Sequence, residues 1–371
     1  MLSRTFHTFA QCALTLCMFS APIMADCTIE GLLSNFEDYS KKNQMDAVLL
    51  LRNGKPLFQY NSNAQTTHFD TMEIRDSLMA IAIMQLLDSG QISSLEDPIN
   101  YYIPDCITNL TLRHLLSSYF GQTRADSSIA LSKVIQKASG KQLETYFLEN
   151  LFLPLGITDI CWRTTWESPT PHLHLSSSDL AKIGTLILNK GFWNGRQVIS
   201  ERRLEMLLLP SQTNNPFLGM QWQLELYETA CWWDDELLET YRQFGIDDFI
   251  VTKLAALEGR VLYCSGQFFG TYYLVFSPND LATAFGSQEN ADAFILAAQS
   301  KGLPLARFKQ GGVKSISAIG QGGQQLLIFP RENLIAVRQK RLPSPPCRDS
   351  LNREFTLLLD TIAQPSVLPI E

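Results

Sequence analysis

The sequence of 371 residues lacks an excess of positive charge, because 30 Lys and Arg stand against 37 Asp and Glu, for a net charge of −7. This balance argues against nucleic acid and against anionic membrane surfaces as main partners. Beyond residue 25, no apolar run is long enough to cross a membrane as a helix. Internal repeats, low-complexity runs and linkers are also missing, so we expect residues 26–371 to form one large domain or two closely packed subdomains.

Two signatures of serine acylation are absent as well. No serine in the chain has a lysine three residues later, and no Gly-x-Ser-x-Gly sequence occurs. Cysteines at metal-binding spacing are also missing, so structural pairing in up to three disulfides is favoured over metal binding. The cysteines beyond residue 25 are Cys27, Cys106, Cys161, Cys231, Cys264 and Cys347.

The first 25 residues have the pattern of a secretory signal peptide. Arg4 precedes an apolar run at 10–19, and Ala25 ends the segment. The run is too short to serve as a permanent membrane anchor. We therefore expect cleavage after Ala25 and export of residues 26–371 to the periplasm or the medium.

The densest apolar pattern lies at 78–87, where a helix would be buried nearly all round. Gly90 stands where a left-handed C-terminal cap is expected. The sequence therefore predicts a buried central helix that ends before Gly90.

Short sequences in and after this helix match one family: AIMQL at 82–86, GQIS at 90–93, EDP at 96–98 and LRHLL at 112–116. On these residues the chain resembles the serine β-lactamase and penicillin-binding-protein superfamily, most closely its class C β-lactamase-like and esterase-like branch. The resemblance implies an α/β fold of the β-lactamase/transpeptidase type, a mainly antiparallel sheet flanked by helices, with a helical subdomain at about 70–209. The interval 220–315 matches poorly, and we interpret it as an inserted or diverged region.

Two hairpins fit the resemblance. Residues 46–60 place two apolar runs around Asn53 and Gly54, a strong hairpin signal. Residues 320–338 place glycines before two further apolar runs, which predicts an edge hairpin. A helix is expected at 352–362, beside the sheet.

The resemblance assigns a role to the glycines in this second hairpin. In the family the glycine-rich strand lines the pocket and supplies a backbone N–H to the oxyanion hole. Gly320, Gly322 and Gly323 are therefore candidate pocket-edge binding residues.

The same register indicates that the reactive groups of the family are missing here. Glu73 and Asp76 stand where the Ser and Lys of its Ser-x-x-Lys motif are expected. Thr123 and Ala125 stand in place of the Tyr and Asn of Tyr-x-Asn. The Lys/His-Thr-Gly element should fall at 318–320, which reads Ala-Ile-Gly.

Glu73 and Asp76 have two interpretations. Paired carboxylates can carry out acid–base or metal chemistry, but we favour capping or paired charges, with Arg75 or Arg124 as partner. A carboxylate at a helix N-terminus is stabilised by the helix dipole, and residues three apart face a similar direction. The site would then be anionic, and it would repel the carboxylate-bearing substrates that the resemblance implies.

Two further motifs each have two interpretations. His172 and His174 could be half of a metal site, yet no third ligand is evident and 169–176 is predicted to be a loop, so surface histidines are favoured. The WWDD sequence at 232–235 fits an exposed contact for sugar or peptide, or a partly buried loop anchor. Nothing in the sequence indicates a cofactor.

These observations lead to three hypotheses. The first is an exported pseudoenzyme that binds a ligand or partner, with a cell-envelope peptide, glycan or protein as the partner. The second is an active hydrolase of esterase, amidase or peptidase type that uses non-standard residues. The third is a purely structural envelope protein.

Overall fold

A computed structural model describes most of the chain, in thirteen segments. They are residues 29–63, 65–106, 110–117, 124–165, 168–211, 216–227, 229–257, 262–264, 267–269, 272–274, 285–309, 311–341 and 349–363. The expected signal peptide and Thr123 lie outside the described residues.

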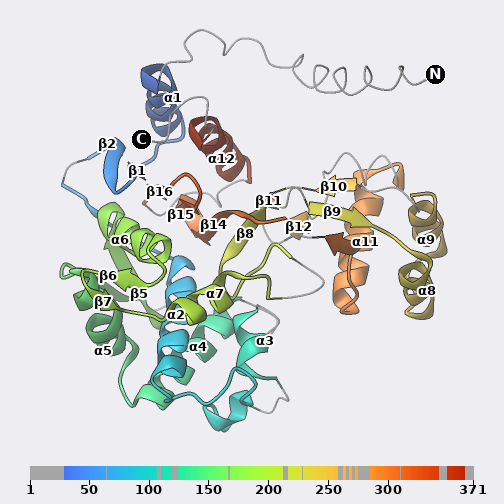
Figure 1. Cartoon of the computed structure of the whole chain (residues 1–371), viewed down its shortest axis with the longest axis horizontal. Coiled ribbons are helices and arrows are strands. Elements are labelled where there is room, and N and C mark those ends of the chain that lie inside the picture. Colours follow the sequence, from blue (N-terminus) through green and yellow to red (C-terminus); the bar gives the residue numbers. More distant parts are fainter. Residues whose placement is uncertain are drawn as a thin grey trace, which may run out of the picture.

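A six-stranded antiparallel sheet forms the centre of the fold, in the order β2-β1-β16-β15-β14-β8 (Figure 1). Its strands are β1 (Ala47–Arg52), β2 (Lys55–Asn61), β8 (Gln223–Leu226), β14 (Val313–Gly320), β15 (Gln324–Phe329) and β16 (Leu334–Gln339). Strands far apart in the sequence meet in this sheet, because β1 pairs with β16.

Both predicted hairpins form, but the second, β15–β16, does not lie at the edge of the sheet as predicted. Asn53 and Gly54 turn β1 into β2 with φ of 50° and 72°, the left-handed geometry that favours an Asn-Gly hairpin turn. The β15–β16 hairpin lies in the middle of the sheet, not at its edge, because β14 and β1 pair with its two sides. Because strands pair with it on both sides, every residue of β15 and β16 is buried.

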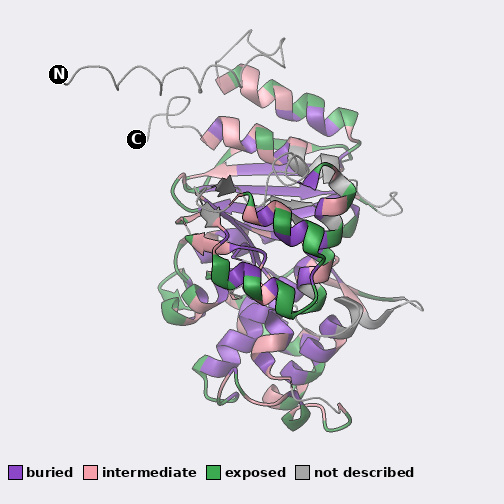
Figure 2. Ribbon diagram, turned by 90° about the vertical axis from the view of Figure 1, so that its right-hand side faces the viewer, coloured by how far each residue is buried: buried purple, intermediate pink, exposed green. Residues whose placement is uncertain are grey.

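Helices α1 (Ile29–Lys42) and α12 (Asp349–Ala363) cover one face of the sheet (Figure 2). Phe36 and Phe355, one from each helix, pack with the strand residues Val48 and Phe329. The fully buried Arg338 of β16 belongs to this layer: its Nη1 donates to the Tyr39 hydroxyl at 2.6 Å, and its guanidinium lies 5.0 Å from the centroid of Phe355. The helix expected at 352–362 is thus confirmed as part of α12.

The second face carries α6 (Ser177–Leu188) and the helical part of the chain, which is organised around α2 (Ile74–Asp88). All but two residues of α2 are buried, as its apolar pattern predicted, and Gly90 follows it with φ of 73°. The other helical elements are η1 (Ile99–Tyr101), α3 (Leu112–Leu116), α4 (Arg124–Ser139), α5 (Leu143–Phe147), η2 (Leu148–Phe152), η3 (Leu153–Leu155) and α7 (Glu201–Leu208).

Short strands accompany these helices. They are β3 (His68–Asp70), β4 (Cys161–Thr165) and β5 (Ser168–Ser176), which form one sheet, and the hairpin β6 (Phe192–Trp193) and β7 (Arg196–Gln197). The prediction of a loop at 169–176 was therefore wrong, because this segment pairs on both sides with β3 and β4.

The poorly matched interval contains a lobe between β8 and β14, which are themselves neighbours in the main sheet. It consists of β9 (Thr229–Trp232), α8 (Asp235–Gln243), α9 (Asp248–Ala255), β10 (Leu262–Cys264), β11 (Gln267–Phe269), β12 (Tyr272–Leu274), α11 (Gln288–Ser300) and β13 (Arg307–Lys309). Trp233 is an anchor and not an exposed contact: it is 1% exposed, and its Nε1 donates to the Leu305 carbonyl.

Two of the six expected disulfide cysteines can be judged. Cys106 and Cys161 are free thiols, so the structure forms no disulfide with either. Cys27 and Cys347 lie outside the described residues, and the side chains of the other two are not described. Among the described residues no helix is long and apolar enough to cross a membrane.

The packing of α12 on the sheet yields a stability prediction. Leu359 is fully buried, whereas Leu357, two residues earlier, is 51% exposed. We expect Leu359→Ala to lower the free energy of unfolding by about 2–5 kcal/mol, and Leu357→Ala to change it by less than about 0.5 kcal/mol. Urea unfolding of both variants measures the difference, and equal losses would contradict this placement of α12.

Candidate functional site

The turn that leads into α2 is held rigidly in an unusual conformation. Met72 has φ of 50°, a region that non-glycine residues rarely adopt and that costs free energy unless the surroundings enforce it. The Asp70 carboxylate accepts the Met72 N–H at 2.8 Å. Thr71 donates both its N–H and its hydroxyl to the Leu173 carbonyl of β5. These bonds place Glu73 at the N-cap position of α2. Its side chain makes no capping hydrogen bond to the helix, so the interpretation of Glu73 as a cap was wrong.

The end of β14 comes into contact with this turn because residue 320 is glycine. A Cβ at Gly320 would lie 2.7 Å from the Thr71 carbonyl oxygen and 2.9 Å from the Met72 Cβ, which no side chain tolerates. The close approach brings the Gln321 N–H within 2.6 Å of Glu73 Oε2, to which it donates. The backbone N–H that follows β14 is therefore already used in a charge-assisted hydrogen bond to the Glu73 carboxylate.

Asp76 turns to a different part of the structure. It is 6% exposed, and its Oδ1 accepts a hydrogen bond from the Ser128 hydroxyl of α4 at 2.8 Å. Arg75 links the same serine to β5, donating to Ser128 Oγ at 2.8 Å and to the Pro171 carbonyl. The expectation that both carboxylates face a similar direction was wrong, because Glu73 contacts the end of β14 and Asp76 contacts α4.

A histidine–carboxylate pair lies beside the turn. Asp70 Oδ2 is 2.5 Å from His172 Nδ1, and both side chains are largely buried. Among the described residues, His172 Nε2 is buried and has no hydrogen-bond partner. His172 and His174 lie on β5 and are half-buried, so the expectation of surface histidines was wrong. The described residues contain no group of three metal-ligating side chains.

The remaining candidates are placed as follows. Gly320 ends β14 at the contact just described, while Gly322 and Gly323 are buried in the one-turn helix η4 (Gln321–Gly323) that leads into β15. Thr123 lies outside the described residues, and Ala125 lies in the first turn of α4, where its side chain is not described. The structure thus brings Glu73 and Gly320 together.

Sequence reasoning missed the parts played by Ser128, Asp70 and His172. Ser128 is one of several serines in α4 and carries no local signal; only the packing of α4 on α2 places it near Asp76. Asp70 and His172 are 102 positions apart and meet because β3 pairs with β5.

Comparisons with known proteins identify the fold. No protein-family model and no curated protein matches the sequence. Among solved structures, a class C β-lactamase from Rhodobacter sphaeroides superposes with a TM-score of 0.53 at 13% identity, over 90% of this chain and 99% of that one. A β-lactamase from Mycobacterium bovis gives 0.51 at 12% identity, over 85% and 93% of the two chains. A penicillin-binding protein from Bacillus halodurans gives 0.50 at 11% identity, over 87% and 99%.

The protein therefore has the fold shared by β-lactamases and penicillin-binding proteins, as the sequence motifs predicted. At these identities the likeness establishes the fold alone. What the site does has to be argued from its own residues.

The contact at Gly320 yields a prediction. Gly320→Ala places a methyl group against Thr71 and Met72, and we expect it to lower the free energy of unfolding by about 1–3 kcal/mol. Gly312→Ala is the matched control, because a Cβ there meets only Arg331 Nη2 at 3.5 Å, and we expect a change below about 1 kcal/mol. Urea unfolding measures both, and a Gly320→Ala variant as stable as the control would refute the close approach.

His174 predicts a dependence of stability on pH. Burial lowers the pKa of His174 below its ordinary 6.5, and the nearby Asp70 opposes this only in part. The unfolded chain then binds a proton more readily than the folded one, so this contribution to stability is complete above pH 6.5 and is lost as the pH falls through the folded pKa.

The measurement is urea unfolding on either side of this pH, for the unmodified chain and for His174→Gln. We expect the unmodified chain to lose more stability on acidification than the variant does, since the glutamine does not titrate. Equal losses in the two proteins would show that His174 has no such effect.

Proposed function

We propose that this protein is an exported, catalytically inactive relative of the β-lactamases and penicillin-binding proteins that acts by binding a ligand or partner. The observation that carries the proposal is the hydrogen bond between the Gln321 N–H and the Glu73 carboxylate, at the start of α2. A side chain of the protein itself already accepts the hydrogen bond of this backbone N–H.

The chemistry of acyl transfer supports the proposal. That reaction needs a hydroxyl or thiol nucleophile, a base that takes its proton, and N–H donors free to receive the developing oxyanion. Glu73 offers no hydroxyl, and it occupies a donor that an oxyanion would need. Asp76, at the position of the motif's lysine, is a carboxylate that accepts a hydrogen bond from Ser128 of α4.

The charge of the site indicates what it would bind. Glu73, Asp76 and Asp70 lie within one turn and its adjoining helix, with Arg75 turned toward Ser128 and Pro171. An anionic group that approaches the start of α2 would meet the Glu73 carboxylate, with two further carboxylates buried behind it, whereas a neutral or cationic group would not be repelled. A cell-envelope peptide, glycan or protein with such a group is the partner we propose, on the additional ground of the signal-peptide pattern in the first 25 residues.

The test is turnover of a chromogenic cephalosporin and of a short-chain p-nitrophenyl ester by the purified protein and by its Glu73→Ala and Glu73→Ser variants. We expect no turnover above buffer from any of them, because a serine at 73 would still lack a lysine at 76 to take its proton. Ester turnover by the unmodified protein that is lost in Glu73→Ala would sink the proposal and make Glu73 a catalytic residue.

One observation favours a second candidate, an active hydrolase with non-standard residues. The Asp70–His172 pair has the geometry that orients an imidazole as a general base, and Ser128 lies in the adjoining network through Arg75. Against it, the Ser128 hydroxyl donates to Asp76 and not to His172. In the same assay, this candidate requires turnover that survives Glu73→Ala and disappears in both Ser128→Ala and His172→Gln.

A further inference from the structure

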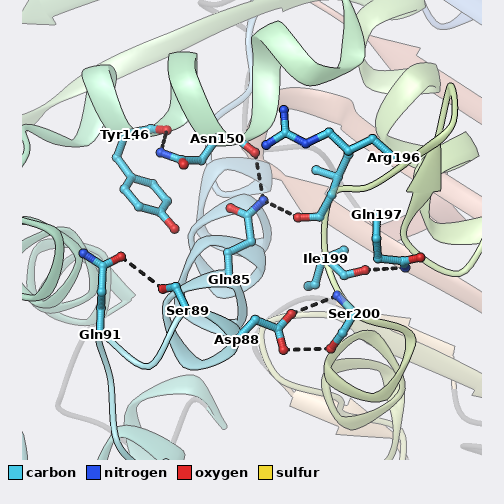
Figure 3. Close-up of a pocket in the computed structure, with 11 residues that line it drawn as sticks. Gln85, Asp88, Ser89, Gln91, Tyr146, Asn150, Arg196, Gln197, Ile199 and Ser200 are labelled. Carbon is cyan, nitrogen blue, oxygen red and sulfur yellow. Dashed lines mark hydrogen bonds between the residues drawn. The ribbon is translucent and has the colours of Figure 1, made fainter.

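A polar pocket lies at the opposite end of α2 from Glu73. Its volume is about 500 Å³, within the range of small-molecule sites. The last turn of α2 and the segment that follows it form one wall, and α5, η2, β7 and the start of α7 form the others (Figure 3). Since the 15 residues of α2 span about 22 Å, this pocket is separate from the site at Glu73.

Gln85 gives the pocket an unsatisfied acceptor. The residue is 8% exposed, and its Nε2 donates to the carbonyls of Asn150 and Val198 at 2.9 and 3.0 Å. These two bonds fix the orientation of the amide. Oε1 is then left buried without a hydrogen-bond partner among the described residues. A buried acceptor without a donor is costly, so a donor group supplied from the pocket would bind favourably here.

Asp88 lies one turn further along the same face of α2 and forms an ion pair with Arg203, which offsets part of its charge. Its carboxylate accepts the N–H and hydroxyl of Ser200 at 2.8 Å each and the Nε of Arg203 at 3.3 Å. A carboxylate has about four acceptor positions, so one stays open. The C-terminal end of α2 contributes its partial negative charge at the same place. This wall of the pocket therefore favours a cationic donor.

Arg196 gives the pocket a positive group on another wall. It lies on β7, is exposed, and forms no ion pair with the residues that the structure describes. In Figure 3 its side chain extends toward Asn150, beyond Gln85 as seen from Asp88. A guanidinium free of an internal carboxylate binds the carboxylate of a ligand through two parallel hydrogen bonds.

We propose that this pocket binds a small zwitterion, an amino acid or short peptide. The ammonium group donates to Gln85 Oε1 and Asp88, and the carboxylate pairs with Arg196. Opposite charges on opposite walls distinguish this site from one for a neutral sugar or for a simple anion. The proposal rests on the far end of α2 and does not depend on whether Glu73 is catalytically inactive.

The experiment is isothermal titration of the full protein with the dipeptide Gly-Gly, with its C-terminal amide and with its N-acetyl derivative. We expect Gly-Gly to bind and each blocked form to bind about tenfold more weakly or not at all, because each lacks one of the two charged groups that the pocket contacts. Binding of glucose as tightly as Gly-Gly, or no binding of Gly-Gly, would overturn the proposal.

Variants assign the binding to this pocket. Arg196→Gln should weaken Gly-Gly about tenfold while leaving the affinity for the amide unchanged, since the amide has no carboxylate. Arg202→Gln is the matched control, because Arg202 is an exposed arginine on the nearby helix α7 that does not line the pocket, and it should leave both affinities unchanged. Equal effects of the two substitutions, or none from Arg196→Gln, would place the binding elsewhere. The enzyme assays at Glu73 are unaffected by either result.

Discussion

The contact between the end of β14 and the turn before α2 is the constraint on which the site depends. Two backbones meet there at a distance that only a glycine allows, at Gly320, and Met72 holds a left-handed conformation to make the meeting possible. Two hydrogen bonds offset the cost of that conformation: the Asp70 carboxylate accepts the Met72 N–H, and the Leu173 carbonyl accepts the Thr71 N–H. As a result the main sheet and the helical part of the chain share one rigid junction.

The carboxylates around the junction are each satisfied by a different element. Glu73 accepts a hydrogen bond from the Gln321 N–H, which follows β14. Asp76 accepts one from the Ser128 hydroxyl on α4, and Asp70 pairs with His172 on β5. Charged groups this close together would repel one another in a low-dielectric setting, and separate donors reduce that repulsion. The carboxylates at the start of α2 thus connect it to the end of β14, to α4 and to β5, and each of them has a hydrogen-bond partner within the protein.

The lobe at 229–309 leaves this junction intact because of where it enters the sheet. β8 and β14 are adjacent antiparallel strands, so the chain can leave the end of one, form a separate set of helices and strands, and return to the other. Trp233 and Tyr241 tie the lobe together through the carbonyls of Leu305 and Pro304. Insertions between neighbouring strands cost little stability, since they only lengthen a loop.

The sequence by itself determined the fold class. Apolar periodicity predicted α2, apolar runs around turns predicted the β1–β2 and β15–β16 hairpins, and the motifs in and after α2 assigned the fold class. These are local features, and local features are what a sequence pattern encodes.

Only the tertiary structure decided what Asp70, Glu73 and Asp76 touch. The bond from Gln321 to Glu73 joins residues 248 apart, and the pairs Ser128–Asp76 and His172–Asp70 join residues 52 and 102 apart. Likewise, the β15–β16 hairpin is central in the sheet because β1 pairs with β16 and β14 pairs with β15. No local pattern carries such contacts, because they arise when separate elements pack together.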